Sequence, residues 1–250
     1  MKILALDTSG LVASVALVQD GVLLGEYTIN HKKTHSQTLL PMLEQLKGMT
    51  ELCMEDVDAV ALAAGPGSFT GLRIGSATAK GLGLALGKPL IEVPTLEGLA
   101  YQFYGTDKLV CPLMDARRNQ VYTGVYVFEE GDQPGERMKM NCLMAQCAAD
   151  IREVAGRLNE MAGNRPGVVF LGDGVPVYEK ILLEEMKIPY SFAPAHRNRQ
   201  SAAAVAALAE EYYELGRLVS AGEHQPDYLR LSQAERERRE TLQAREEENA

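Results

Sequence analysis

Short apolar runs alternate with longer segments along the first 104 residues. Runs typical of strands cover 2–6, 12–18, 22–29, 58–64 and 89–93. Asp20-Gly21, between the second and third runs, is a strong hairpin signal. The longer segments predict helices at 35–47, 70–86 and 95–104, and Leu39, Leu43 and Leu46 line one face of the first.

The same order of elements begins again after residue 105. Predicted strands cover 108–114, 120–128, 137–143 and 168–171, and predicted helices cover 145–161, 175–186 and 201–215. The order strand-strand-strand-helix-strand-helix (βββαβα) therefore occurs twice, although no repeat is visible at the level of residues. Strands joined by helical crossovers predict an α/β fold with mixed sheets covered by helices.

This duplication suggests a division of the chain. Residues 1–104 form an N-terminal lobe, 105–200 a C-terminal lobe, and 201–232 a helix and extension that pack back on the core. Residues 233–250 are nearly all Glu, Arg and Gln, so we expect a disordered tail that has too few apolar residues to fold.

A glycine-rich turn joins the predicted strand 58–64 to the helix 70–86. It reads Gly65-Pro66-Gly67-Ser68-Phe69-Thr70-Gly71-Leu72-Arg73-Ile74-Gly75. Backbone N–H groups at a helix start attract anions, so the turn could hold a phosphate, but it lacks the Gly-Lys-Ser/Thr of a Walker loop. Alternatively, the small residues serve close packing. They recur every fourth position, at Gly71, Gly75, Ala79, Gly83 and Gly87. Because this ridge drifts by about 40° per step, we expect one end to meet the chain's own core and the other end to meet something else.

The composition of the chain indicates which kinds of molecule it is suited to bind. Hydrophobic residues make up 46% of the chain, and the formal net charge is −9. An acidic chain is a poor ligand for nucleic acid or anionic membranes by itself. No uncharged stretch is long enough for a membrane span, and no secretory signal opens the chain. Four cysteines without Cys-x-x-Cys spacing fit a reducing cytoplasm, so we expect a cytoplasmic protein.

Several motifs resemble one known family. They are Ile3-Leu4-Ala5-Leu6-Asp7-Thr8-Ser9, His35-Ser36-Gln37 with Leu39-Leu40-Pro41, the glycine-rich stretch 65–75, Asp115-Ala116-Arg117 with Val121-Tyr122, and Pro226-Asp227-Tyr228-Leu229-Arg230. Over residues 1–232 the chain resembles the TsaB (YeaZ) family, bacterial factors in making threonylcarbamoyladenosine at tRNA position 37. The resemblance implies the two-lobed superfold of actin, Hsp70 and the sugar kinases, which agrees with the duplicated order.

The sister family TsaD holds a metal partly through two histidines in a motif of the form Val-Asn-His-Leu-Glu-Gly-His. The similar stretch here, Val93 to Leu99, has Thr95 and Leu99 at those two positions. Threonine is a poor metal ligand and leucine cannot be one, so the comparison implies no metal and no catalytic residue. His31 and His35 are four residues apart, as paired ligands can be, but no third ligand is apparent. Thr34 or Ser36 more simply serves as a helix N-cap.

The resemblance further implies that helices 35–47 and 70–86 dock on TsaD. The predicted interface residues are His35, Leu39, Leu43, Leu46, Gly71, Arg73, Gly75 and Ala79. Arg73 could bind a carboxylate or phosphate, or it could be a solvated helix charge.

Two turns are candidates for nucleotide contact. Asp7-Thr8-Ser9-Gly10 lies where the superfold places its first phosphate loop, and Gly172-Asp173-Gly174 lies where it places its adenosine loop. Such residues after a strand are also ordinary turn chemistry. We expect no nucleotide on the chain alone, although ATP or ADP could bind within a complex. The basic spots at 117–118 and 197–199 fit surface solubility better than RNA contact.

These inferences give a leading hypothesis and an alternative. The chain would be a non-catalytic scaffold and activator of TsaD, which, with the ATPase TsaE, modifies N6 of adenosine 37 in tRNAs that read codons beginning with adenine. The partners would bind most of the tRNA, and the chain alone could form a homodimer. The alternative is an ATP-dependent phosphotransferase or hydrolase in which Asp7 handles metal and phosphate. A metallopeptidase is disfavoured by Thr95 and Leu99.

Overall fold

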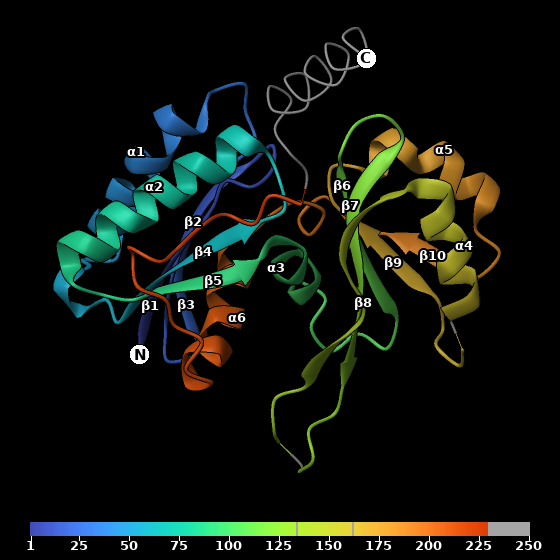
Figure 1. Ribbon diagram of the computed structural model, residues 1–250. Coiled ribbons are helices and arrows are strands. Elements are labelled where there is room, and N and C mark those ends of the chain that lie inside the picture. The colour runs from blue at the N-terminus through green and yellow to red at the C-terminus, as the bar shows by residue number, and fades with distance from the viewer. Residues whose placement is uncertain (134, 162, 230–250) are drawn as a thin grey trace, which may run out of the picture.

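The computed structural model describes residues 1–133, 135–161 and 163–229. It has two lobes, each built on a five-stranded sheet (Figure 1). The predicted tail at 233–250 and Arg230 of the last family motif lie outside the described residues.

The N-terminal sheet has the order β3-β2-β1-β4-β5. Its strands are β1 (Lys2–Asp7), β2 (Ala13–Gln19), β3 (Val22–Ile29), β4 (Ala59–Gly65) and β5 (Leu90–Pro94). β1 runs antiparallel to β2 and parallel to β4, with Ile3 opposite Ala59. The central strands β1 and β4 are almost wholly buried, as their continuous apolar runs predict.

The C-terminal sheet repeats this arrangement in the order β8-β7-β6-β9-β10. Its strands are β6 (Leu109–Asp115), β7 (Gln120–Glu129), β8 (Lys139–Asp150), β9 (Val168–Leu171) and β10 (Tyr190–Phe192). β6 is antiparallel to β7 and parallel to β9, with Leu109 opposite Val168. The duplicated βββαβα order and the two-lobed α/β fold are therefore confirmed.

Each lobe carries a pair of helices on one outer face of its sheet. α1 (His35–Met49) and α2 (Phe69–Leu86) cover the N-terminal sheet, and α4 (Ile151–Met161) and α5 (Val175–Glu185) cover the C-terminal one (Figure 1). Thr34 is the N-cap of α1. The Ser68 hydroxyl caps α2 by accepting a hydrogen bond from the Gly71 N–H, and Gly87 ends that helix in the left-handed conformation.

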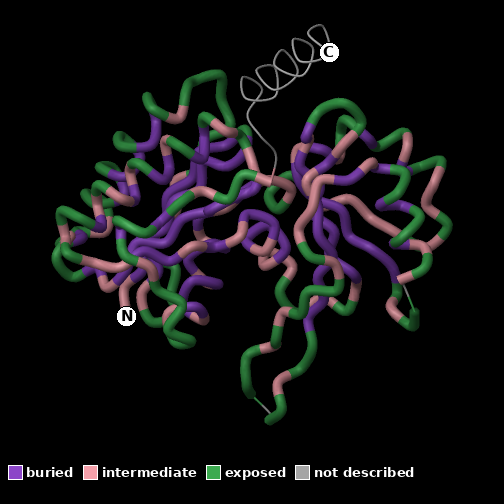
Figure 2. Tube along the Cα trace, viewed as in Figure 1, coloured by how far each residue is buried: buried purple, intermediate pink, exposed green. Residues whose placement is uncertain are grey.

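Each of two further helices, α3 and α6, packs against the lobe other than the one that it follows in the sequence. α3 (Thr95–Tyr101) follows the N-terminal sheet but packs Leu96 and Leu99 into a cluster with Tyr126 of the C-terminal sheet. α6 (Ala202–Glu214) follows the C-terminal sheet but packs Val205 and its neighbours against the N-terminal sheet. This reciprocal crossing interlocks the lobes, and Figure 2 shows buried positions running through both sheets and both helices.

The residues after α6 return along the N-terminal lobe as an irregular segment, 216–229, which we call the C-terminal strap. Val219 pairs with Leu90 at the outer edge of β5, and the Asp227 N–H donates to the Ala64 carbonyl. The strap thereby reaches the glycine-rich turn at the gap between the lobes (Figure 1).

The structure corrects the bounds of two predicted helices and adds a strand. The helix predicted at 145–161 begins only at Ile151, because 147–150 pair with β7 and extend β8. The strand β10 was not predicted, since three half-buried residues give no periodic signal. The helix predicted at 95–104 ends at Tyr101. Along the described parts of the chain, every helix falls short of the length and apolar character needed to cross a bilayer.

Candidate functional site

The leucines predicted to face a partner from α1 lie in the core of the N-terminal lobe. Leu39 is 1% exposed, Leu46 is fully buried, and Leu43 is buried beside them against β1 and β2. Ala79 of α2 joins the same cluster. Assigning these four residues to the partner interface was wrong, because a stripe of leucines with helical spacing is first of all the stripe that covers the sheet.

The inner ridge of α2 also packs on the chain itself. A Cβ atom on Gly71 would lie 2.0 Å from the Thr8 carbonyl oxygen, and one on Gly75 would lie 2.5 Å from the Thr8 hydroxyl. Gly83 faces Leu90 in the same way. The glycines therefore allow α2 to approach the end of β1, and the prediction that Gly71 and Gly75 face a partner was wrong.

His35, at the start of α1, is half-buried, and its Nε2 lies 3.0 Å from the Gly10 carbonyl oxygen. Its position ties α1 to the turn after β1 rather than presenting the ring outward. Arg73, by contrast, is exposed on α2, with its guanidinium 4.0 Å above the Phe69 ring, which in turn stacks on Tyr228 of the strap.

The outward side of the helix pair carries a second set of small and apolar residues. We call this surface the α1–α2 face; it comprises the small or apolar residues Leu40, Ala77, Gly81 and Leu84 together with the charged Arg73. Leu40 is 57% exposed and Leu84 is 72% exposed, and a Cβ on Gly81 would meet nothing within 4 Å. Four of these five residues were not predicted from the sequence, although Arg73, Ala77 and Gly81 have the same four-residue spacing as the inner ridge.

The polar groups of the turn after β1 form hydrogen bonds within the N-terminal lobe. The Asp7 carboxylate is 2% exposed and accepts hydrogen bonds from the Ser9 N–H (2.9 Å) and the Ser9 hydroxyl (2.6 Å). Burial raises the pKa of Asp7 to about 6, against the lowering effect of those two bonds. The Thr8 hydroxyl donates to the Gly71 carbonyl, and the Ser9 carbonyl accepts from the Ser68 N–H. The polar groups here thus bind one another, including an N–H at the start of α2 that could otherwise meet an anion.

The corresponding turns of the C-terminal lobe are built differently. The Asp173 carboxylate accepts from the Asp115 N–H at 3.1 Å, and burial raises the pKa of Asp173. Asp115, at the end of β6, accepts from the Tyr178 hydroxyl and pairs with Arg117 at 3.3 Å. Gly172 has a φ of +104° and lies against the Leu113 carbonyl, where a side chain would collide.

The two candidate nucleotide turns do not meet directly. Among the hydrogen bonds and ion pairs of the described residues, none joins Asp7–Gly10 to 172–174. Instead, Arg199 and Gln200 lie between them: Arg199 donates to the Gly172 carbonyl at 3.1 Å, and the Gln200 amide abuts Gly10. Residues 197–199 were interpreted as surface charge, and only the folded chain brings them to the interlobe position.

Thr95 and Leu99, which the family resemblance set against two metal-binding histidines, serve packing here. The Thr95 hydroxyl accepts from the Gly65 N–H at 3.2 Å, and Leu99 is 1% exposed in the α3 cluster. Within the part of the chain that the structure describes, no group of three or more His, Cys, Asp or Glu side chains is arranged to hold a metal ion.

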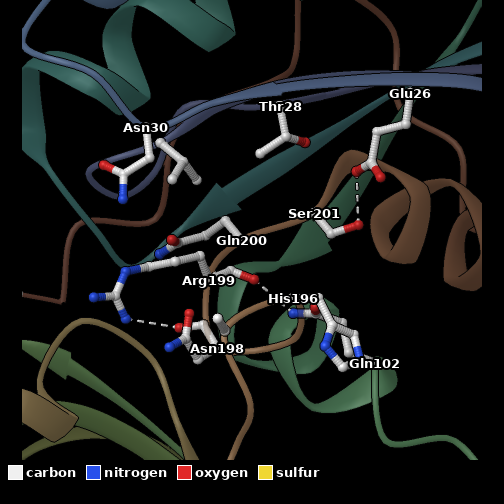
Figure 3. Close-up of a pocket in the computed structure, with 11 residues that line it drawn as sticks. Glu26, Thr28, Asn30, Gln102, His196, Asn198, Arg199, Gln200 and Ser201 are labelled. Atoms are coloured by element: carbon white, nitrogen blue, oxygen red, sulfur yellow. Dashed lines mark hydrogen bonds between the residues drawn. The ribbon is translucent and has the colours of Figure 1, made fainter.

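A pocket of about 510 Å³ opens beside Arg199 and Gln200 (Figure 3). We call it the β3 pocket. Its lining residues are Val12, Glu26, Thr28, Asn30, Gln102, Ala195, His196, Asn198, Arg199, Gln200 and Ser201. β3 forms one wall, and the segment leading into α6 forms the other.

Comparison with known proteins gives concordant matches. The family model described as TsaD, tRNA N6-adenosine threonylcarbamoyltransferase, matches residues 22–243. The "tRNA threonylcarbamoyladenosine biosynthesis protein TsaB" of Bacillus subtilis is 33% identical over 238 residues, which cover 94% of this chain and 96% of that protein. Its Escherichia coli namesake is 36% identical over 133 residues, covering 52% of this chain and 57% of that one. The solved structure of YeaZ from Pseudomonas aeruginosa superposes with a TM-score of 0.72 at 30% identity, over 91% of this chain and 99% of that chain.

Proposed function

Because the chain belongs to the TsaB (YeaZ) family of tRNA threonylcarbamoyladenosine biosynthesis proteins, we propose that it is a non-catalytic scaffold that binds and activates TsaD. In this proposal TsaD and the ATPase TsaE complete the complex, which attaches the threonylcarbamoyl group to N6 of adenosine 37. Any ATP or ADP is held within the complex rather than by this chain alone.

The observation that supports the proposal is the α1–α2 face. A helix that only covers a sheet turns polar residues outward, whereas α2 turns Ala77, Gly81 and Leu84 outward. Gly81 has open space beside its Cα, so the backbone of a partner helix can approach closely there. Arg73 at the margin, oriented by Phe69, adds a charged hydrogen-bond donor to an otherwise apolar surface.

The acidic charge of the chain fits a complex in which other subunits bind the tRNA. With a net charge of −9, it contributes little attraction to a phosphate backbone, so the partners supply the basic surface for tRNA. Activation then means that the scaffold binds the competent conformation of TsaD more tightly than other conformations.

Gly81→Glu tests the docking site without disturbing the core. The new side chain has open space and points outward, so the fold should persist while a charge enters the α1–α2 face. We expect loss of TsaD binding in a pull-down and in size-exclusion chromatography with light scattering. Gly75→Leu is unsuitable for this purpose, because its side chain would collide with Thr8.

Gly156→Glu is the matched control. Gly156 lies within α4 of the other lobe, and a Cβ on it would also meet nothing within 4 Å. This variant should bind TsaD like the unmodified chain. Normal binding by Gly81→Glu, or equal loss in both variants, would overturn the placement of the interface.

The same experiment addresses self-association. Without TsaD, two copies could cover their α1–α2 faces against each other as an isologous homodimer. We expect a homodimer that converts to a heterodimer when TsaD is added, and Gly81→Glu should make the isolated chain monomeric. A monomer that ignores TsaD would contradict the scaffold role.

A further inference from the structure

The β3 pocket contains polar groups that the fold leaves without partners. Gln200 is 2% exposed, yet neither its amide nitrogen nor its amide oxygen has a hydrogen-bond partner among the described residues. The Arg199 Nε is likewise buried and unpartnered within the described chain. Because an unsatisfied buried polar group costs about 1–3 kcal/mol, Gln200 and Arg199 carry hydrogen-bonding capacity that the described fold does not use.

The walls of the pocket are fixed from both lobes. The Gln102 amide donates to the Arg199 carbonyl at 2.8 Å, and the Gly172 N–H donates to the Asn198 carbonyl at 3.1 Å. On the opposite side, the hydroxyls of Ser14 and Thr28 lie 2.7 Å apart on β2 and β3. A pocket held in this way is ready to bind without rearrangement of its backbone.

Two opposite charges lie in the pocket without an ion pair between them. Glu26 uses only its Oε1, which accepts hydrogen bonds from Ser14, Ser201 and the Ala203 N–H at the start of α6, so its Oε2 accepts none within the described chain. The Arg199 guanidinium donates only to backbone carbonyls of the described residues. Figure 3 shows the Glu26 carboxylate and this guanidinium at opposite ends of the pocket.

Carboxamides also line the pocket. Asn30, Asn198 and Gln200 each offer a donor and an acceptor, whereas the described lining includes the exposed His196 imidazole but no Phe, Tyr or Trp ring to stack on a base. Paired donors and acceptors match the N–H and C=O groups of peptide bonds.

We propose that the β3 pocket binds a short peptide of two or three residues, with its ammonium group at Glu26, its carboxylate at Arg199 and its amides on the carboxamide wall. This site is separate from the α1–α2 face and goes beyond the scaffold function.

Triglycine is the probe, tested on the full chain by calorimetry and by amide chemical shifts in NMR. We expect binding that shifts the signals of residues lining the pocket. N-acetyl-triglycine and triglycine amide, which each lack one charge, should bind about tenfold more weakly, as should free glycine. No binding of triglycine at millimolar concentration, or equal binding of the acetylated or amidated form, would overturn the proposal.

Glu26→Gln tests whether the Glu26 carboxylate binds the ammonium group of the peptide. The glutamine oxygen can keep the three hydrogen bonds that Glu26 Oε1 accepts, so the fold should persist. Triglycine should then bind this variant only as weakly as N-acetyl-triglycine does, while TsaD binding stays unchanged. Glu160→Gln on α4 is the control and should bind triglycine normally. Equal affinity in Glu26→Gln and the unmodified chain would contradict the assignment.

Discussion

The two lobes share one architecture but treat their outer helices differently. On α4 and α5 seven exposed residues are charged: Arg152, Glu153, Arg157, Glu160, Glu179, Lys180 and Glu184. On the longer pair α1 and α2 only three are: Glu44, Lys47 and Arg73. Since both pairs cover a sheet in the same way, the fold does not demand this difference. A docking surface on α1 and α2 would explain the smaller number of charges there, although α5 also exposes the apolar side chains of Val177 and Leu183.

The two lobes also differ in the burial of the aspartate that ends the first strand of each. Asp7 and Asp115 each close the first strand of a lobe. Asp7 is buried behind Ser9, whereas Asp115 is 13% exposed and pairs with an arginine at the surface. The N-terminal lobe also binds the C-terminal strap along β5. The N-terminal lobe thus buries the carboxylate at the end of its first strand, while its outer helices carry fewer exposed charges. The variants described below test this contrast between the lobes.

The largest effect should come from the inner ridge of α2. Gly71→Ala places a methyl group 2.0 Å from the Thr8 carbonyl, so either α2 or β1 must move, and we expect a loss of about 3 kcal/mol in the free energy of unfolding. Gly81→Ala on the outer side should instead gain up to about 1 kcal/mol from helix propensity. Urea denaturation of both variants measures the difference. Similar values would mean that the two sides of α2 are equivalent.

Asp7→Asn should stabilise the protein, and the effect should depend on pH. The pKa of Asp7 is raised from 3.8 to about 6, so the folded state holds this proton more tightly than the unfolded state, and stability falls as the pH rises between those values. Two pKa units correspond to about 3 kcal/mol. Asparagine keeps an oxygen for both bonds from Ser9 but carries no charge. The gain should therefore be greatest above about pH 7 and shrink as the pH falls through 6 toward 4.

Asp115→Asn is the matched variant in the other lobe. Its ion pair with Arg117, whose side chain is 85% exposed, contributes little, so stability should change by less than about 1 kcal/mol. Thermal unfolding across this pH range tests the pair. A destabilised Asp7→Asn variant would show that the ionised carboxylate makes a stabilising interaction other than its hydrogen bonds with Ser9.

The sequence was sufficient for the duplicated order because alternation and apolar runs are local signals. It failed at 145–150, where a segment taken for helix pairs with β7, and pairing of this kind is set by the partner strand. It could not have linked His224 to Ser76, which are 148 residues apart.

The docking residues were mistaken for a more specific reason. Small residues four apart occur on both sides of α2, as Gly71, Gly75 and Ala79 on one side and as Ala77, Gly81 and Ala85 on the other. Periodicity identifies both rows but not which of them faces the sheet. The position of Thr8 at the end of β1 decides that question, and it is a tertiary contact.

His224→Leu tests how the strap contributes to the N-terminal lobe. The ring is fully buried, with Nδ1 2.5 Å from a Glu92 carboxylate oxygen and Nε2 2.9 Å from the Ser76 hydroxyl. Leucine fills similar space but leaves the buried serine unpaired, so we expect a loss of about 2 kcal/mol and faster amide exchange in 216–229. His196→Leu, at an exposed position, should change stability by less than about 0.5 kcal/mol. Unchanged exchange would mean that the strap is held without His224.

The smallest effect should come from the charged face of the C-terminal lobe. Arg157 and Glu153 pair at 2.5 Å along α4, but both side chains are about half exposed. Water screens such a pair, so Glu153→Gln should cost about 0.3–0.5 kcal/mol by urea denaturation. A cost above about 1 kcal/mol would mean that these charges hold α4 in place. The contrast between the lobes would then reflect structural need in one of them rather than a docking surface on the other.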